Sequence, residues 1–465
     1  MCYHKVLKYF NPEEKYMEKE LLELIENKQY AKVKETMSNM LVPDVADILD
    51  KIESKNELVK IFRLLPKDLS AEVFSYASSD TQEILVNAFT DKEIRAVIDE
   101  MYLDDTVDFL EEMPANVVNR ILSKVSPEDR KEINQFLRYK EDSAGSIMTN
   151  EFLDLKSTST VRSAINKIKK FGEELETIIT IYITDAQRVI EGYVSIKELI
   201  MADEDEKVGD IMHTNIIYAH TDTDQEEIAQ LFSKYSLAVL PIVDNEKRLV
   251  GIVTADDIIE VVQEEGSEDL QMVAAIAPIE DKPYLKTSVF SIWLQRIPWL
   301  CILMLSATFT GIVINSYEST LSPLLFACVP MLMGTGGNAG SQASVTAIRS
   351  IALGEVEFKD MFKVLWKEFR VSVILSITLA VVCFLKLQLI DRMMLGYEYS
   401  PMISLVICVA MVITILIAKI VGAALPILAK KLHLDPAVVA SPFITTIVDV
   451  VSLLVYCNIS ILILG

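Results

Sequence analysis

The last apolar stretch of the chain carries one acidic side chain, Asp449. It lies in SPFITTIVDVVSLLVY, Ser441 to Tyr456, and it is the only formal charge between Asp435 and Gly465. An ionised carboxylate at the centre of a bilayer costs roughly 2.5–3.5 kcal/mol, so such a residue by default marks a pathway for ions or substrate. The predicted chemistry at Asp449 is therefore cation binding inside a membrane.

A helix through this stretch places its polar side chains on one face. Ser441, Thr445, Asp449, Ser452 and Tyr456 follow one another at spacings of four, four, three and four residues. The opposite face carries Phe443, Ile447, Val450 and Leu454, which suit lipid. An ion pair with Lys419 is the structural alternative for Asp449. The stripe of small hydroxylated residues favours a channel wall instead.

A second polar segment at membrane depth is PMLMGTGGNAGSQASV, Pro330 to Val345. Its glycines let helix backbones approach closely, and tight packing explains most of them, whereas the amides of Asn338 and Gln342 need polar partners. No Gly-Lys-Ser/Thr follows the glycines, which excludes a phosphate-binding loop.

Five apolar runs are long enough to span a bilayer. They cover Ile297–Tyr317, Ser319–Ile348, Val371–Ile390, Tyr399–Ala418 and Pro436–Gly465. The loops after the second and fourth runs hold most of the Lys and Arg residues, whereas Glu318 lies in a turn without any. The positive-inside rule then predicts residues 1–285 in the cytoplasm and the C-terminus outside the cell membrane.

Charge is segregated along the 465 residues. From Lys286 onward there are 12 basic and 9 acidic residues, whereas residues 1–285 have a net charge of −26. Such a charge repels nucleic acid and attracts cations. No signal peptide is expected at the N-terminus. The six cysteines and four histidines are scattered, which argues against a disulfide framework and a zinc site.

The acidic half divides in two. Residues 21–139 show apolar positions at helical spacing, interrupted at Pro66, Pro114 and Pro127, which predicts a helical solenoid. From about 140 to 265 strands and helices alternate and repeat at an offset of about 60 residues. GSIMTNEFLDLKSTSTVRSAINKI is echoed by GDIMHTNIIYAHTDTDQEEIAQLF, and EGYVSIKELI by VGIVTADDII. Each repeat resembles a CBS domain, and the two together resemble a CBS pair.

CBS pairs often bind adenine nucleotides through a Thr-x-x-Asp motif, which Thr254 and Asp257 match and Ser195 and Glu198 match less well. A hydroxyl and a carboxylate at this spacing also form an ordinary helix cap. ATP or another adenine nucleotide is therefore a secondary expectation.

The whole chain closely resembles the MgtE family of magnesium channels. The resemblance lies in the domain order and in the motifs GTGGNAGSQ, VGIVTADDIIEVV and DPAVVASPFITTIVDV. The resemblance implies a multidomain chain with an all-α N-terminal helical solenoid, an α/β tandem CBS pair and a five-helix transmembrane domain. The expected bounds are 1–139 for the helical domain, 140–204 and 205–265 for the CBS repeats, 266–290 for a connecting helix, and 291–465 for the transmembrane domain.

The resemblance also implies a function and its residues. A homodimer is expected to conduct Mg²⁺ through a pore on its two-fold axis, with Asp449 of each subunit holding the hydrated ion and Asn338, Ser441 and Thr445 lining the pore. Mg²⁺ bound to the cytoplasmic half is expected to close that pore. The residues implied for this regulation are Glu72, Asp104, Asp224, Glu226, Asp257, Glu260, Glu265, Glu268, Asp269 and Asp435.

Two positions depart from the family pattern. Ser441 stands where an asparagine is usual, which affects pore selectivity, and Ser236 stands where an acidic residue can occur, which implies one fewer inhibitory contact.

Three other functions can be weighed against this one on sequence grounds. A less selective carrier of Co²⁺ or Mn²⁺ is the first, because carboxylates discriminate poorly among such ions. An intramembrane aspartyl protease would need a second aspartate deep in the membrane, so no enzyme is expected. A sensor without transport would not need the polar stripe or the glycine-rich helix.

Overall fold

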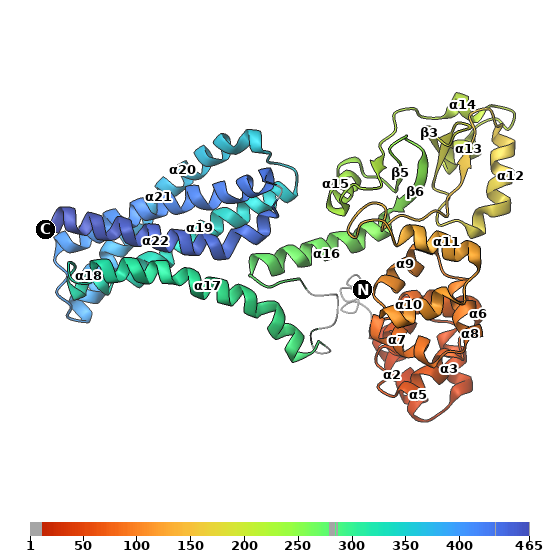
Figure 1. The fold of residues 1–465 in the computed structure, drawn as a ribbon, viewed down its shortest axis with the longest axis horizontal. Coiled ribbons are helices and arrows are strands. Elements are labelled where there is room, and N and C mark those ends of the chain that lie inside the picture. The colour runs from red at the N-terminus through yellow and green to blue at the C-terminus, as the bar shows by residue number, and fades with distance from the viewer. Residues whose placement is uncertain (1–11, 279–283, 285–286, 433, 465) are drawn as a thin grey trace. The chain divides into compact units, whose positions relative to one another are not determined.

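The computed structural model describes residues 12–278, 284, 287–432 and 434–464. The chain forms two compact units, Met1–Gln263 and Glu264–Gly465, and each is described by itself (Figure 1).

The first unit begins with a row of short helices. They are α2 (Pro12–Glu26), α3 (Tyr30–Met37), α4 (Val42–Leu49), α5 (Lys55–Phe62), α6 (Lys67–Ser75), α7 (Ser79–Ala88), α8 (Asp91–Ile98), α9 (Leu103–Glu111), α10 (Ala115–Leu122) and α11 (Pro127–Phe136). Helix α3 contacts α5, α4 contacts α6, α5 contacts α7 and α6 contacts α8. This regular stacking is that of a solenoid. Pro66 and Pro114 directly precede helices, and Pro127 is the first residue of α11, as predicted.

The rest of this unit holds two similar α/β repeats. The first contains β1 (Asp154–Leu155), α12 (Val161–Phe171), η1 (Gly172–Glu174), β2 (Thr180–Thr184), β3 (Ile190–Ser195) and α13 (Ile196–Met201). The second contains α14 (Val208–Ile211), β4 (Ala219–His220), α15 (Gln225–Tyr235), β5 (Val239–Val243), β6 (Leu249–Thr254) and α16 (Ala255–Val273). In each sheet the first strand is parallel to the second, and the third is antiparallel to it. This repetition confirms the CBS pair.

The two repeats exchange a segment. Thr149 and Ile252 donate their backbone N–H groups to each other's carbonyl oxygens at 2.8 and 2.9 Å, and Tyr193 and His213 do the same at 3.0 and 2.9 Å. The segment that opens each repeat therefore pairs with the last strand of the other repeat's sheet, so the pair folds as one body.

Helix α16 continues beyond the second repeat to Val273. It therefore contains the first residues of the connecting helix expected over 266–290. Residues 279–283 and 285–286 of that expected helix lie outside the described residues.

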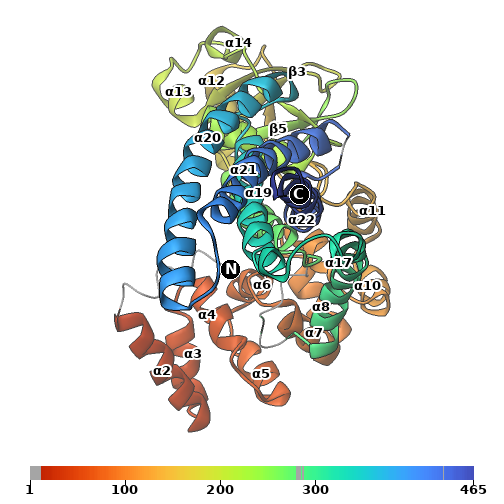
Figure 2. The same ribbon diagram turned by 90° about the vertical axis from the view of Figure 1, so that its left-hand side faces the viewer.

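The second unit is a bundle of long helices. Its elements are α17 (Val289–Tyr317), α18 (Pro323–Phe326), α19 (Val329–Ala352), η2 (Phe358–Asp360), α20 (Met361–Leu385), the π-helix η3 (Lys386–Met394), α21 (Pro401–Lys431) and α22 (Pro436–Leu464). Helices α19, α21 and α22 pack against one another, α20 packs on α21, and α17 packs on α22 (Figure 2).

Among the described residues, four helical segments are long and apolar enough to cross a membrane: Val289–Tyr317, Phe358–Met394, Pro401–Lys431 and Phe443–Leu464. The sequence predicts five spans, and four candidate spans are found among the described residues. Helix α19 is also long, at 24 residues, but its glycines and amides make it less apolar than the others. Its place in the bundle, against both α21 and α22, explains why polar and small residues are tolerated there.

Candidate functional site

Asp449 lies where α22 faces the glycine-rich helix α19. A Cβ atom at Gly337 would lie 3.3 Å from Cγ2 of Thr445 and 3.9 Å from Oδ1 of Asp449. Among the described residues no Lys, Arg or His forms an ion pair with Asp449. The Asp449 side chain is half-buried on α22.

Lys419, the alternative ion-pair partner for Asp449, forms an ion pair with a different carboxylate. Its Nζ lies 3.6 Å from Oε2 of Glu368 in α20, and the two side chains are 6% and 14% exposed. The structural explanation of Asp449 as the partner of Lys419 is therefore wrong.

The remaining polar stripe of α22 faces the interior of the bundle. Ser452 and Tyr456 are fully buried, and Tyr456 Oη donates a hydrogen bond of 2.8 Å to the carbonyl of Leu325. Phe443, Ile447 and Leu454 are exposed on the opposite face, which suits lipid. The side chain of Ser441 lies outside the described part of the structure.

Asn338 lies on another face of α19. It lines a hollow of about 350 Å³ that also involves α20 and α21. The lining residues are Thr335, Asn338, Ala339, Gln342, Leu375, Thr378, Leu379 and Ile415. The structure therefore brings Thr445 together with Asp449 at Gly337, while Asn338 borders this separate hollow.

The first unit contains a second group of carboxylates, where the helical domain meets the CBS pair. Val107 of α9 and Phe136 of α11 share a core with residues of the second repeat such as Ile228 and Leu240. This packing brings Asp104 within electrostatic reach of Asp257 and Glu176, and Tyr76 within reach of Glu72 and Glu260. Four residues implied for regulation, Glu72, Asp104, Asp257 and Glu260, therefore lie in one region.

Burial and neighbouring charges disfavour the ionised forms of Asp104 and Asp257. Burial, and then the charges of Asp105, Asp257 and Glu176, hold the pKa of Asp104 well above its usual range. Oδ1 of Asp104 is also buried without a hydrogen-bond partner among the described residues. A cation placed here would relieve both penalties, so the region fits a divalent ion.

Three further carboxylates belong to this region but carry no signal in the sequence. Burial raises the pKa of Glu151 and of Glu176 to about 7, and that of Asp105 to about 6. Glu151 and Glu176 lie in loops of the first repeat, far along the chain from α9. Only the tertiary packing brings them there, so sequence reasoning missed them.

Of the other residues implied for regulation, Asp224 and Glu226 lie at the start of α15, and Glu265, Glu268, Asp269 and Asp435 belong to the second unit. Asp224 caps α15 by accepting a hydrogen bond of 3.0 Å from the backbone of Glu226, and Ser236 ends the same helix in the left-handed region with φ of 52°. Glu265 and Glu268 lie further along α16. Burial and the neighbouring charge of Asp435 raise the pKa of Asp269, so these two predicted residues lie together.

Within the described residues, no three His, Cys, Asp or Glu side chains converge closely enough to hold a bare metal ion. Mg²⁺ keeps much of its water and is commonly held by one or two carboxylates, which needs less convergence than a zinc site.

The two residues of the expected nucleotide-binding motif, Thr254 and Asp257, hydrogen-bond to each other. Thr254 Oγ1 donates a hydrogen bond of 2.5 Å to Oδ2 of Asp257, which also accepts the N–H of Thr254 at 3.2 Å. In the first repeat, Ser195 and Glu198 form the same cap, and His213 Nε2 lies 2.6 Å from Oε1 of Glu198. Both pairs act as helix caps in this structure.

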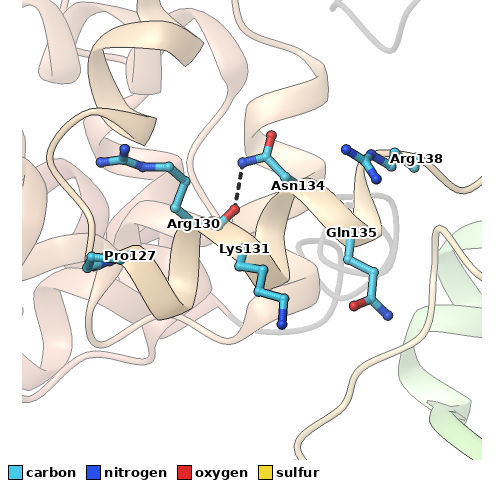
Figure 3. Close-up of a pocket in the computed structure, with 6 residues that line it drawn as sticks. All are labelled: Pro127, Arg130, Lys131, Asn134, Gln135 and Arg138. Carbon is cyan, nitrogen blue, oxygen red and sulfur yellow. Dashed lines mark hydrogen bonds between the residues drawn. The ribbon is translucent and has the colours of Figure 1, made fainter.

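A hollow of about 390 Å³ on α11 is unsuited to cations. Figure 3 shows its lining residues on α11 and just after its end, with Arg130 and Lys131 on the helix and Arg138 following it. Asn134 donates a hydrogen bond of 2.6 Å to the carbonyl of Arg130. Three basic side chains repel Mg²⁺, so we do not place a cation site there.

The raised pKa values predict that the soluble part loses stability as pH rises. Between about pH 4.5 and 7 the folded state holds protons on Glu151 and Glu176 that the unfolded chain has released, so the free energy of unfolding falls with increasing pH. We expect the melting temperature of a fragment of residues 1–275 to drop by about 5–10 °C from pH 5 to pH 8 without divalent ions.

Differential scanning calorimetry measures this drop. The double variant Glu151→Gln/Glu176→Gln should flatten the pH dependence, whereas Glu128→Gln, at an exposed site on α11, should leave it unchanged. A wild-type melting temperature that rises over this pH range would contradict the prediction.

A carboxylate without an ion-pair partner among the described residues, in a chain with four helices apolar enough to cross a membrane and an acidic part with a CBS pair, is typical of a membrane transport protein for cations. Comparison with known proteins agrees. Residues 329–459 match the MgtE family model, described as a divalent cation transporter, residues 40–142 match the MgtE intracellular N domain, and residues 208–264 match the CBS domain. The chain belongs to the MgtE family of magnesium transporters.

The similarity extends over nearly the whole chain. It is 33% identical to the magnesium transporter MgtE of Thermus thermophilus over 438 residues, which cover 93% of this chain and 95% of that protein. The Bacillus subtilis magnesium transporter MgtE is 29% identical over 433 residues, which cover 90% and 94%. The crystal structure of the soluble part of a magnesium transporter superposes with a TM-score of 0.51 at 28% identity, covering 54% of this chain and 99% of that chain.

Proposed function

We propose that this magnesium transporter is a Mg²⁺-selective channel that mediates magnesium uptake and closes when Mg²⁺ binds its acidic cytoplasmic domains. The observation that carries the proposal is Asp449, a carboxylate without an ion-pair partner among the described residues, placed beside the glycines of α19. The membership of the MgtE family identifies Mg²⁺ as the transported ion.

The pore follows from the chemistry of Mg²⁺. The ion gives up its water reluctantly, so a conducting site has to hold it hydrated, through carboxylates and carbonyl oxygens. In a homodimer, Asp449 and Asp449 of the partner subunit would face each other across the two-fold axis and form a doubly negative ring. Thr445 lies one turn of α22 away on the same side, and Ser441 one turn further.

The closing step uses the carboxylates of the soluble part. Without Mg²⁺, the charge of Asp257 repels those of Asp104 and Glu260, which opposes close packing of the helical domain on the CBS pair. Bound Mg²⁺ would reverse this repulsion and draw the domains together. Asp269 and Asp435 form a smaller acidic pair by which the start of α22 would respond to the same ion.

The remaining expectations complete this proposal. Five spans, with α19 as the second, would leave the N-terminus in the cytoplasm and the C-terminus outside, as the positive-inside rule predicts. A nucleotide at Thr254 and Asp257 would have to displace the hydrogen bond between them.

Mg²⁺ uptake into vesicles that contain the purified full-length protein tests the function. A dye inside the vesicle reports entry, and protein-free vesicles are the control. We expect uptake well above the control while Mg²⁺ on the side of the soluble domains is low. When that side is raised to millimolar Mg²⁺, uptake should fall several-fold, because the acidic region is then occupied.

The same assay separates the alternatives. If Co²⁺ or Mn²⁺ enters as fast as Mg²⁺, the chain is a less selective divalent transporter. If no divalent ion enters faster than in protein-free vesicles under either condition, the proposed transport is refuted.

A further inference from the structure

The buried ion pair of the second unit lies close to the predicted ion path. Lys419 and Glu368 join the middle of α21 to the first turns of α20 with an N–O distance of 3.6 Å. Removing two charges from water costs several kcal/mol per ion, and an ion pair repays this only with good geometry. Here Oε2 of Glu368 has no hydrogen-bond partner among the described residues. Stabilisation alone therefore explains this pair poorly.

Asp449 and the residue before Lys419 both lie against the same stretch of α19, between Gly337 and Gly340. The carbonyl oxygen of that residue, Ala418, lies 3.3 Å from the position that a Cβ at Gly340 would take, and Cγ2 of Ile444 lies 3.0 Å from the same point. Gly337, one turn earlier on α19, lies beside Asp449. A lysine charge at this depth acts on a cation at Asp449 through a medium of low dielectric.

We propose that Glu368 neutralises Lys419 so that no positive charge opposes Mg²⁺ at Asp449, which makes Glu368 a positioning residue for conduction. This inference rests on the proposed function. Two unit charges about 12 Å apart, at an effective dielectric of about 20, interact strongly enough to change ion occupancy by roughly tenfold, and a divalent ion feels twice this energy. An uncompensated Lys419 would therefore lower Mg²⁺ flux by about tenfold or more.

The sign of the charge left behind distinguishes this role from simple packing. Glu368→Gln leaves a positive charge and should lower Mg²⁺ flux about tenfold in the vesicle assay. Lys419→Met leaves a negative charge and should keep or raise the flux. The double variant Glu368→Gln/Lys419→Met leaves neither charge and should recover flux to within about threefold of wild type.

Flux is compared only among variants that elute from size-exclusion chromatography as the wild type does. Equal losses in both single variants, or a double variant as inactive as Glu368→Gln, would overturn the proposal, because both results indicate a packing role. Wild-type flux in Glu368→Gln would overturn it as well. An inactive wild type would instead refute the transport function on which the inference rests, so the two failures are distinguishable.

Discussion

Asp449→Asn is expected to lower Mg²⁺ flux about 100-fold or more while the protein stays folded. Asparagine has nearly the same shape but no charge. A divalent ion about 5 Å from a carboxylate gains roughly 6–7 kcal/mol at an effective dielectric of about 20. If desolvation offsets more than half of this, about 2.7 kcal/mol remains, which corresponds to a factor of about 100.

The vesicle assay measures this loss, with low Mg²⁺ on the side of the soluble domains. Glu318→Gln is the matched control, because Glu318 is an exposed carboxylate at the end of α17. It should conduct as the wild type does. An Asp449→Asn protein with at least a third of wild-type flux would show that the carboxylate lies outside the ion path.

The repeated architecture of the soluble part was predictable because it depends on local pattern. Glycines at 192 and 251 mark where each sheet accepts the exchanged segment. A Cβ at Gly192 would lie 2.8 Å from the carbonyl of His213, and a Cβ at Gly251 would lie 2.8 Å from that of Thr149. The sequence repeat predicted both units. It could not predict that they exchange segments, because pairing across repeats leaves no periodicity of its own.

The acidic region was predictable only in part. Glu72 and Asp104 were implied by family resemblance, but Glu151 and Glu176 reach the same region through the packing of α9 and α11 on the second repeat. Acidic residues are common in this chain, with 67 in total, so charge alone does not select the ones that gather. Burial raises the pKa of Asp104, Glu151 and Glu176, and this marks these three as members of the buried group.

In the membrane unit the position of Asp449 followed from sequence, but its surroundings did not. Hydropathy locates a helix without fixing its rotation about its axis. The rotation of α20 and α21 decides that Lys419 meets Glu368, and the rotation of α19 decides that Gly337 faces Asp449 while Asn338 faces the separate hollow. Both are outcomes of packing between helices that are far apart in the chain.

The second large effect is expected at Gly422 of α21, where one methyl group should disrupt the bundle. A Cβ at this position would lie 2.2 Å from the carbonyl oxygen of Gly340 and 2.9 Å from its carbonyl carbon. These are backbone atoms of α19, so no side chain can rotate away, and the two helices would have to separate. Overpacking of a core commonly costs about 1–3 kcal/mol, and a backbone clash of this kind belongs at the upper end or beyond.

We therefore expect the melting temperature of Gly422→Ala in detergent to lie about 6–12 °C below that of the wild type. The measurement is the loss of the monodisperse size-exclusion peak as the sample is heated. Gly334→Ala is the matched control, because Gly334 lies in α19 and a Cβ at this position would meet no atom within 4 Å among the described residues. Alanine favours helix over glycine by roughly 1 kcal/mol, so this control should be neutral or slightly stabilising. If both variants melt together, close contact between α19 and α21 is not what holds the bundle around Asp449. If only Gly422→Ala lowers the melting temperature, the glycines of α19 are needed for close helix packing. Asp449 is then the residue of this interface that acts on the ion.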